Sequence, residues 1–221
     1  MIPTPLAAVI FDMDGLLLDT EALYREAIFT ACAEQGHEMV EHLHLSLIGT
    51  PKELGDAKLV AHFGLRFDLR SYHAACSDHF DELCAFDVPL RPGVHGILDT
   101  LKRAGIPTAV ATSTARTTAE AQLRRAGIID SFNALVTRTD VLRGKPDPET
   151  FLKAAELLKA HPSNCLALED SHNGVRAAAA AGMATIMIPD LLPPTSEIES
   201  MCVGVLPSLS DVQLRISALY L

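Results

Sequence analysis

Short, uninterrupted apolar runs recur along the chain and predict strands that are buried on both faces. The first run covers residues 6–11 and stops at Asp12. Four later runs repeat this pattern, at residues 108–112, 134–137, 165–168 and 185–188. Strands of a parallel sheet have this continuous apolar character when helices cover both faces, because neither face then meets water.

Segments with apolar residues at helical spacing separate these runs. They cover residues 93–104, 115–126, 148–159 and 173–181. Strands that alternate with helices indicate parallel pairing through right-handed crossovers. The predicted fold class is therefore α/β, with a Rossmann-like parallel sheet and helices on both of its faces.

The alternation is interrupted directly after the first strand. Three amphipathic segments follow instead, at residues 21–35, 52–62 and 70–84. Prolines at 89 and 92 mark the end of this region, after which the alternation of strands and helices resumes. We interpret it as an inserted all-helical cap domain over residues 18–87, within a catalytic core made of residues 1–17 and 88–221. The alternative is that these helices merely pack on one face of the sheet.

Composition and charge exclude several classes of protein. The start of the chain lacks the pattern of a signal peptide, and no apolar stretch is long enough to span a bilayer, so we expect a cytoplasmic protein without membrane contact. The net charge of −10 argues against a nucleic-acid partner. Five scattered cysteines without a Cys-x-x-Cys pair indicate reduced thiols rather than disulfides or zinc. We expect a monomer.

Two pairs of carboxylates stand where predicted strands end. Asp12 and Asp14 follow the first run, and Gly15 allows the tight turn that lets residues two apart face one crevice. Such a pair can divide the roles of nucleophile and general acid–base, although Asp-x-Asp is common in loops. Glu169 and Asp170 follow the fourth run, where a cation would offset two adjacent carboxylates. A solvated turn or a helix cap is the alternative there.

A lysine and a set of hydroxyls lie beyond two other strands. Lys145 is held in a loop with prolines at 146 and 148, so its ammonium could hold a phosphoryl oxygen and offset carboxylates. Thr112, Ser113 and Thr114 precede the predicted helix 115–126, and a helix start with free N–H groups and hydroxyls can bind an anion. A solvated lysine and ordinary helix capping are the alternatives.

All four groups lie at, or just beyond, the carboxyl ends of predicted parallel strands, where open α/β sheets bind ligands. In this order they resemble the four motifs of the haloacid dehalogenase superfamily, over essentially the whole chain. The helical insert is similar to that of the subgroup with beta-phosphoglucomutase and phosphoglycolate phosphatase. The strings FDMDGLLLDTE, GKPDPETF and LEDSHNGVRAAAAAGM resemble most the pseudouridine-5'-phosphatase-like branch.

The resemblance implies an enzyme that hydrolyses a small phosphate monoester, of the sugar phosphate or nucleoside monophosphate type. It implies that Asp12 attacks phosphorus to form an aspartyl-phosphate, and that Asp14 protonates the leaving group and then activates water. Thr112 and Lys145 would hold the phosphoryl oxygens and take part in catalysis, with Ser113 as a further substrate ligand.

The resemblance also implies a Mg²⁺ cofactor. Its ligands would be Asp12, the backbone carbonyl of Asp14, Asp170 and Glu169, the last either directly or through water. These are the oxygen ligands that Mg²⁺ prefers.

The inserted helices would supply substrate recognition. We expect Tyr24 on the first of them and Lys52 in the loop 49–52 to contact the part of the substrate that does not react, while a solvated Lys52 is the alternative. The resemblance places Tyr24 and Lys52 where beta-phosphoglucomutases carry histidine and arginine.

Three other functions compete with the phosphatase. A sugar-phosphate mutase shares every core residue, but the tyrosine and lysine just described argue against it. The presence of Asp14 argues against a dehalogenase, because a halide leaves without protonation and such an enzyme does not need this second aspartate. A catalytically silent phosphate-binding protein is disfavoured because the carboxylates and the lysine are all present.

Overall fold

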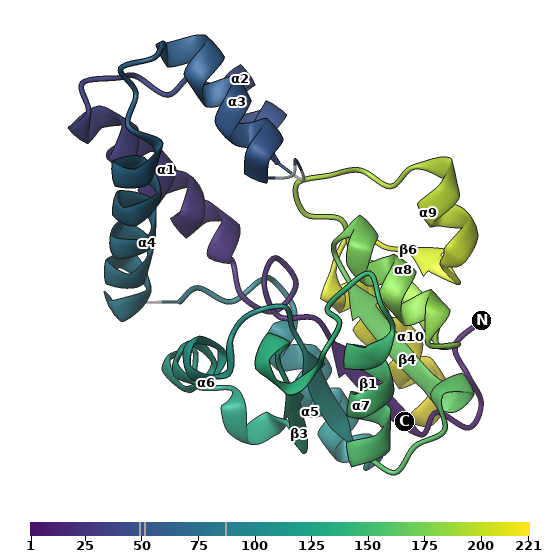
Figure 1. Ribbon diagram of the computed structural model, residues 1–221. Coiled ribbons are helices and arrows are strands. Elements are labelled where there is room, and N and C mark those ends of the chain that lie inside the picture. The colour runs from purple at the N-terminus through teal and green to yellow at the C-terminus, as the bar shows by residue number, and fades with distance from the viewer. Residues whose placement is uncertain (49, 51, 87) are drawn as a thin grey trace. The chain divides into compact units, whose positions relative to one another are not determined.

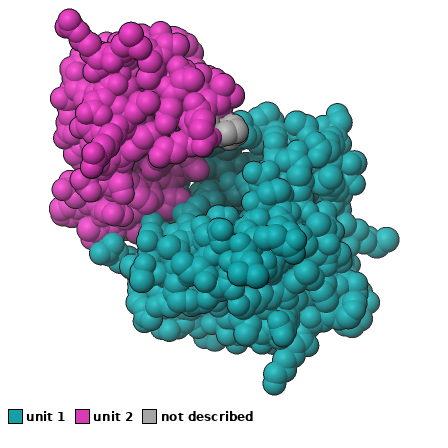
Figure 2. All heavy atoms as spheres, in the orientation of Figure 1, with its two compact units in different colours: residues 1–19, 89–221 teal, residues 20–88 magenta. Residues whose placement is uncertain are grey.

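The computed structural model (Figure 1) describes residues 1–221 except 49, 51 and 87. The chain forms two compact units, which Figure 2 distinguishes by colour: Met1–Asp19 with Pro89–Leu221 is unit 1, and Thr20–Val88 is unit 2. The divisions expected from the sequence fall after residues 17 and 87, slightly earlier than these. Leu18 stays with unit 1 because its backbone forms bridges with Asp14 and Leu90.

Unit 1 is built on one parallel sheet. Its strands are β1 (Ala8–Phe11), β2 (Thr108–Ala111), β3 (Ala134–Val136), β4 (Cys165–Glu169), β5 (Ala184–Met187) and β6 (Gly204–Val205). Their order is β3-β2-β1-β4-β5-β6, so the chain moves outward from β1 in one direction and then returns to continue from β4 in the other. The strand order therefore reverses between β1 and β4, and ligands of such sheets bind at this switch point.

Helices cover both faces of this sheet (Figure 1), which confirms the predicted fold class. α7 (Glu149–Leu157) and α8 (His172–Ala180) pack on one face, where Ile10 shares a core with Phe151. α5 (Val94–Ala104) and α10 (Leu209–Tyr220) contact each other on the opposite face. Val9 and Phe11 are fully buried as well as Ile10, as the apolar run predicts. The other helices of unit 1 are α6 (Arg116–Arg125), α9 (Ser196–Met201) and the 3-10 helices η1 (Ile129–Ser131), η2 (Arg138–Asp140) and η3 (Pro162–Asn164).

The segment beyond residue 188 contains α9, β6 and α10, where the sequence pattern predicts no element. β6 has two residues and obtains its conformation from pairing with β5, where Gly204 lies opposite Ile186. α10 does carry buried residues at helical spacing, Leu209, Val212 and Ile216. Its position against α5, however, is a tertiary contact.

Unit 2 consists of α1 (Thr20–Glu34), α2 (Glu41–Leu47), α3 (Lys52–Phe63) and α4 (Leu69–Phe86). α1 and α4 pack along each other around a core that includes Cys32, Tyr72 and Cys76. α2 was not predicted. His44 counts as polar in a sequence pattern, yet its side chain is buried, and this hides the amphipathic character of the helix.

The cysteines agree with the interpretation as reduced thiols. All five are free; Cys202 is partly exposed, and the other four are buried. Among the described residues, no helix has both the length and the apolar character needed to cross a membrane.

Candidate active site

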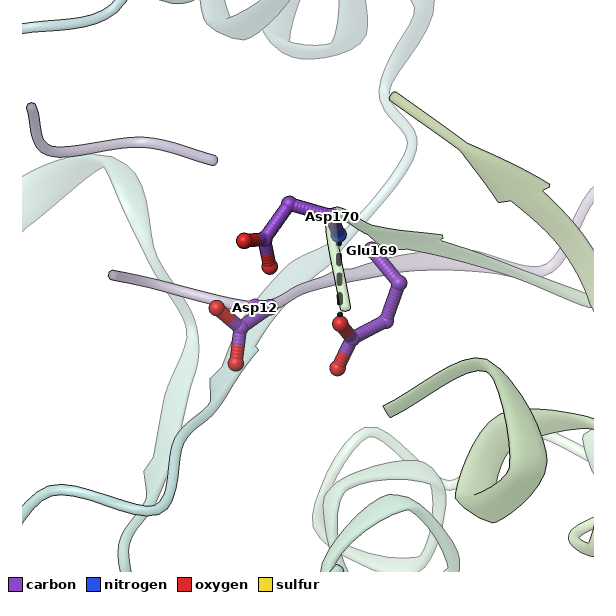
Figure 3. A group of neighbouring side chains, drawn as sticks. All are labelled: Asp12, Glu169 and Asp170. Carbon is purple, nitrogen blue, oxygen red and sulfur yellow. Dashed lines mark hydrogen bonds between the residues drawn. The ribbon is translucent and has the colours of Figure 1, made fainter. Parts of the chain in front are cut away.

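Three carboxylates meet where β1 and β4 end (Figure 3). Asp12 follows β1, Glu169 is the last residue of β4 and Asp170 comes next. One ligand oxygen from each lies within 4.8 Å of the other two. The register explains this, because Phe11 pairs with Leu168, and Asp12 and Glu169 follow them at the ends of adjacent strands. The sheet therefore assembles an oxygen-only ligand set at its switch point.

Lys145 lies between two of these carboxylates. Its Nζ is 2.5 Å from Asp12 Oδ1 and 2.5 Å from Glu169 Oε1. The lysine side chain is 5% exposed and that of Glu169 is fully buried. Buried charges persist only when they are paired and hydrogen-bonded. One ammonium does not balance three carboxylates, so excess negative charge remains.

The electrostatics of the group fit a bound divalent cation. Burial raises the pKa of Asp12; Lys145 opposes this increase, and the carboxylates of Glu169 and Asp14 add to it. Burial also raises the pKa of Asp170, and repulsion by Asp12 and Glu169 adds to the increase. Carboxyl groups that ionise less readily than usual mark a site where a cation would offset the repulsion. Together with the oxygen-only donor set, this fits Mg²⁺.

Lys145 responds to the same surroundings in the opposite sense. Burial disfavours its ammonium, but the adjacent carboxylates of Asp12 and Glu169 outweigh that effect and raise its pKa. Lys145 therefore stays charged and is suited to hold anionic oxygens.

The start of α8 fixes the carboxylate of Glu169. Oε2 accepts hydrogen bonds from Ser171 Oγ at 3.0 Å and from the backbone N–H groups of Asp170 and Ser171 at 3.2 and 3.3 Å. Ser171 Oγ also caps α8 by accepting from the Gly174 N–H at 3.1 Å. Gly174 lies so close that a β-carbon there would overlap the Glu169 carboxylate. No pattern in the sequence marks Gly174.

Position 15 requires glycine for two reasons, its positive φ and the close approach of two carboxylates to its backbone. Its φ is +80°, as the predicted tight turn after Asp14 requires. A β-carbon at this position would stand 2.5 Å from Asp170 Oδ2 and 3.3 Å from Asp190 Oδ2. The glycine therefore lets two carboxylates approach the backbone of the first motif.

The carboxylate of Asp14 lies against hydroxyls that follow β2. Its Oδ2 accepts hydrogen bonds from Thr114 Oγ1 at 2.7 Å and from Thr112 Oγ1 at 3.4 Å. Thr112 Oγ1 in turn accepts from the Thr114 N–H at 3.0 Å. The predicted metal contact of Asp14 uses its backbone carbonyl and stays a prediction. The sequence suggests Thr114 as part of an anion site or as a helix cap, and the structure shows it instead as a hydrogen-bond donor to Asp14.

The remaining predicted substrate ligands are Ser113, Tyr24 and Lys52. Ser113 is exposed in the loop between β2 and α6. Tyr24 and Lys52 belong to unit 2, where the Tyr24 ring packs edge-on against Phe80 with 5.5 Å between centroids and Lys52 is the first residue of α3. Residues 49 and 51 of the predicted recognition loop lie outside the described residues. The substrate-binding roles of all three side chains stay predictions.

Comparisons with known proteins agree on one family. The family model described as haloacid dehalogenase-like hydrolase matches residues 6–182. A phosphorylated carbohydrates phosphatase from Thermotoga maritima is 35% identical over 179 residues, which cover 81% of this chain and 83% of that protein. A Drosophila melanogaster protein, provisionally named a pseudouridine-5'-phosphatase, is 36% identical over 211 residues, covering 91% of this chain and 89% of its own.

Solved structures give the same result. A Thermotoga maritima protein with the provisional name beta-phosphoglucomutase superposes with a TM-score of 0.83 at 30% identity. The match covers 96% of this chain and 98% of that one. The match therefore includes both the sheet of unit 1 and the helical insert between its two segments.

Proposed function

The chain belongs to the haloacid dehalogenase-like hydrolases, and on that premise we propose that it hydrolyses a small phosphate monoester with Mg²⁺ and with Asp12 as the nucleophile. The phosphatases among its relatives indicate a phosphoric monoester hydrolase. The observation that carries the proposal is the group of Asp12, Glu169 and Asp170 around Lys145, at the switch point of the sheet.

In the first step, a carboxylate oxygen of Asp12 attacks phosphorus, the bond from phosphorus to the ester oxygen breaks, and Asp14 donates a proton to the departing alkoxide. Lys145 holds a non-bridging oxygen as charge shifts onto the phosphoryl group. The hydrogen bond from Thr114 Oγ1 to Asp14 Oδ2 supports the assignment of Asp14, because it orients the carboxyl group.

In the second step, Asp14 removes a proton from water, the water oxygen attacks the phosphorus of aspartyl-phosphate, and the bond to Asp12 breaks to give inorganic phosphate. Two displacements of moderate difficulty thus replace one difficult hydrolysis. Asp12, Asp170, Glu169 and the backbone carbonyl of Asp14 would bind Mg²⁺, which supplies positive charge for the phosphoryl oxygens when bound.

The substrate that we propose is a sugar phosphate or a nucleoside monophosphate. Its phosphoryl group is recognised by unit 1, whereas Tyr24 and Lys52 of unit 2 are the residues that we propose to contact the remainder. The names of two relatives support this class, a phosphorylated carbohydrates phosphatase and a pseudouridine-5'-phosphatase.

Phosphate release tests the proposal. With Mg²⁺, the purified protein should release inorganic phosphate from at least one ester in a panel of sugar phosphates and nucleoside monophosphates. An excess of EDTA should reduce the release to background, because three carboxylates and one lysine leave the site too negative for an anionic substrate. Full turnover in EDTA would remove the metal from the scheme, and a panel without any turnover would favour a silent phosphate-binding protein.

A sugar-phosphate mutase is the second candidate, because a solved structure with that provisional name superposes on the chain. Incubation with β-glucose 1-phosphate and a trace of the 1,6-bisphosphate, followed by phosphorus NMR, separates the two functions. We expect inorganic phosphate, because Tyr24 does not titrate near neutral pH as a histidine would. Lys52 also cannot form the bidentate hydrogen bonds with which an arginine would bind a second phosphate. Efficient formation of glucose 6-phosphate with little free phosphate would establish the mutase instead.

A further inference from the structure

Asp190 brings a buried, unpartnered carboxylate oxygen to the same edge of the sheet. It follows β5, the neighbour of β4, and the Ile188 N–H still donates to the carbonyl of Glu169 at 2.7 Å. The Asp190 side chain is only 9% exposed. Within the described part of the chain, its Oδ2 has no hydrogen-bond partner. A buried carboxylate oxygen without a donor is unfavourable, so a ligand or a water molecule should supply one.

Arg91 binds one carboxylate oxygen of Asp190 and leaves the other without a partner among the residues that the structure describes. Its Nη1 lies 2.9 Å from Asp190 Oδ1 and 3.5 Å from Asp19 Oδ1. The Arg91 backbone N–H also donates to the carbonyl of Leu17 at 2.9 Å. Arg91 is therefore tied to the segment that follows the first motif, and it engages Asp190 through Oδ1 only, while Oδ2 remains available.

The available oxygen lies beside a predicted metal ligand. Asp190 Oδ2 and Asp170 Oδ2 both approach the space above the Gly15 α-carbon, at 3.3 and 2.5 Å from the point where a β-carbon would stand. Because residue 15 is glycine, no side chain separates the two oxygens. Despite this closeness, Asp170 does not satisfy Asp190, because Asp190 Oδ2 has no hydrogen-bond partner among the described residues.

We propose that Asp190 is a positioning residue for the metal, and that its Oδ2 accepts a hydrogen bond from water bound to the Mg²⁺ ion. The inference rests on the proposed function, because it requires that ion. Mg²⁺ in proteins usually keeps several of its water molecules. Residues that accept hydrogen bonds from the ligands of a metal orient those ligands and change the affinity for the metal. Arg91 then acts one layer further out, by holding Asp190 in place.

The test is the dissociation constant of Mg²⁺, measured by calorimetric titration without substrate. Asp190→Asn keeps the shape of the side chain and one acceptor for Arg91. Its NH2 group, however, would face water molecules that also donate. We expect Mg²⁺ to bind about 10- to 100-fold more weakly. Asp19→Asn is the matched control, because it removes the other carboxylate beside Arg91, and its Mg²⁺ affinity should equal that of the wild type.

The outcomes separate this inference from the proposed function. A wild-type protein that does not bind Mg²⁺ contradicts the proposed function itself. If the wild type binds Mg²⁺ and a folded Asp190→Asn protein binds it equally well, the inference is wrong, and Asp190 instead acts as a donor to Asp170 or as a purely structural residue. Folding is checked by circular dichroism in EDTA.

A second variant keeps the inference testable if Asp190→Asn does not fold. Arg91→Lys retains the charge but changes the geometry that orients Asp190. It should weaken Mg²⁺ binding in the same direction, by a smaller factor. An unchanged Mg²⁺ affinity in folded Arg91→Lys protein would overturn the role of the Arg91–Asp190 pair.

Discussion

Asp12→Asn protein should lose turnover by at least about 10³-fold and keep its fold, because the change removes the nucleophile of the covalent route. An amide has nearly the shape of a carboxylate, and its oxygen can still accept the hydrogen bond that Lys145 Nζ donates to Asp12. The loss of one charge also relieves repulsion with Glu169 and Asp14, both of which raise the pKa of Asp12. The measurement is phosphate release at saturating Mg²⁺.

Thermal unfolding provides the control for this variant. We expect a melting temperature in EDTA that is equal to or above that of the wild type, because fewer like charges are then buried together. Substantial residual turnover in Asp12→Asn protein free of wild-type enzyme would show that Asp12 does not act as the nucleophile.

Gly174→Ala should reduce turnover by about 10²-fold, because it displaces a group that the chemistry requires in place. A β-carbon at Gly174 would overlap the carboxylate of Glu169. That side chain is fully buried and held by Lys145 and Ser171, so it has to leave at least one of these partners. We expect weaker Mg²⁺ binding together with the loss of turnover.

A second glycine to alanine change serves as the control. Gly55 is also helical, in α3, but a β-carbon there would meet only Leu47, at an ordinary 3.7 Å. Gly55→Ala should leave Mg²⁺ affinity unchanged and slightly stabilise its helix, since alanine is the better helix former. Equal Mg²⁺ affinities of Gly174→Ala, Gly55→Ala and the wild type would mean that the position of Glu169 does not matter to the metal.

Much of the fold could be predicted because its strands are buried on both faces. A run such as residues 6–11 then appears as an unbroken apolar segment, and the charged residue after it marks the strand end. α2 and β6 were not predictable in this way. The burial of His44 in α2 and the pairing of Gly204 in β6 are tertiary properties that no local pattern carries.

The residues of the site also fall into two groups, those that the sequence identifies and those that only the structure reveals. Asp12, Lys145, Glu169 and Asp170 could be identified because each is an unusual residue type at a strand end or in a restricted loop, and the structure brings them together. Asp190 also follows a strand, but a single aspartate before a loop carries no signal until its buried oxygen is seen beside Gly15.

The hydrogen bond of Thr114 and the importance of Gly174 could not be predicted, for two further reasons. A threonine before a helix fits capping as well as it fits a hydrogen bond to a carboxylate 100 residues away in the chain. A glycine within a helical segment indicates only reduced helix propensity, whereas its importance here comes from the approach of Glu169.

The stereochemical course at phosphorus tests the aspartyl-phosphate route most directly. A phosphorothioate ester that the enzyme accepts would be made chiral at phosphorus with ¹⁶O and ¹⁸O and hydrolysed in water labelled with ¹⁷O. The configuration of the released thiophosphate, which then carries sulfur and three different oxygen isotopes, would be determined. Attack by Asp12 followed by attack of water amounts to two in-line displacements, each of which inverts the configuration. The account predicts net retention. Net inversion would show a single direct attack by water, and would contradict the role of Asp12 as the nucleophile.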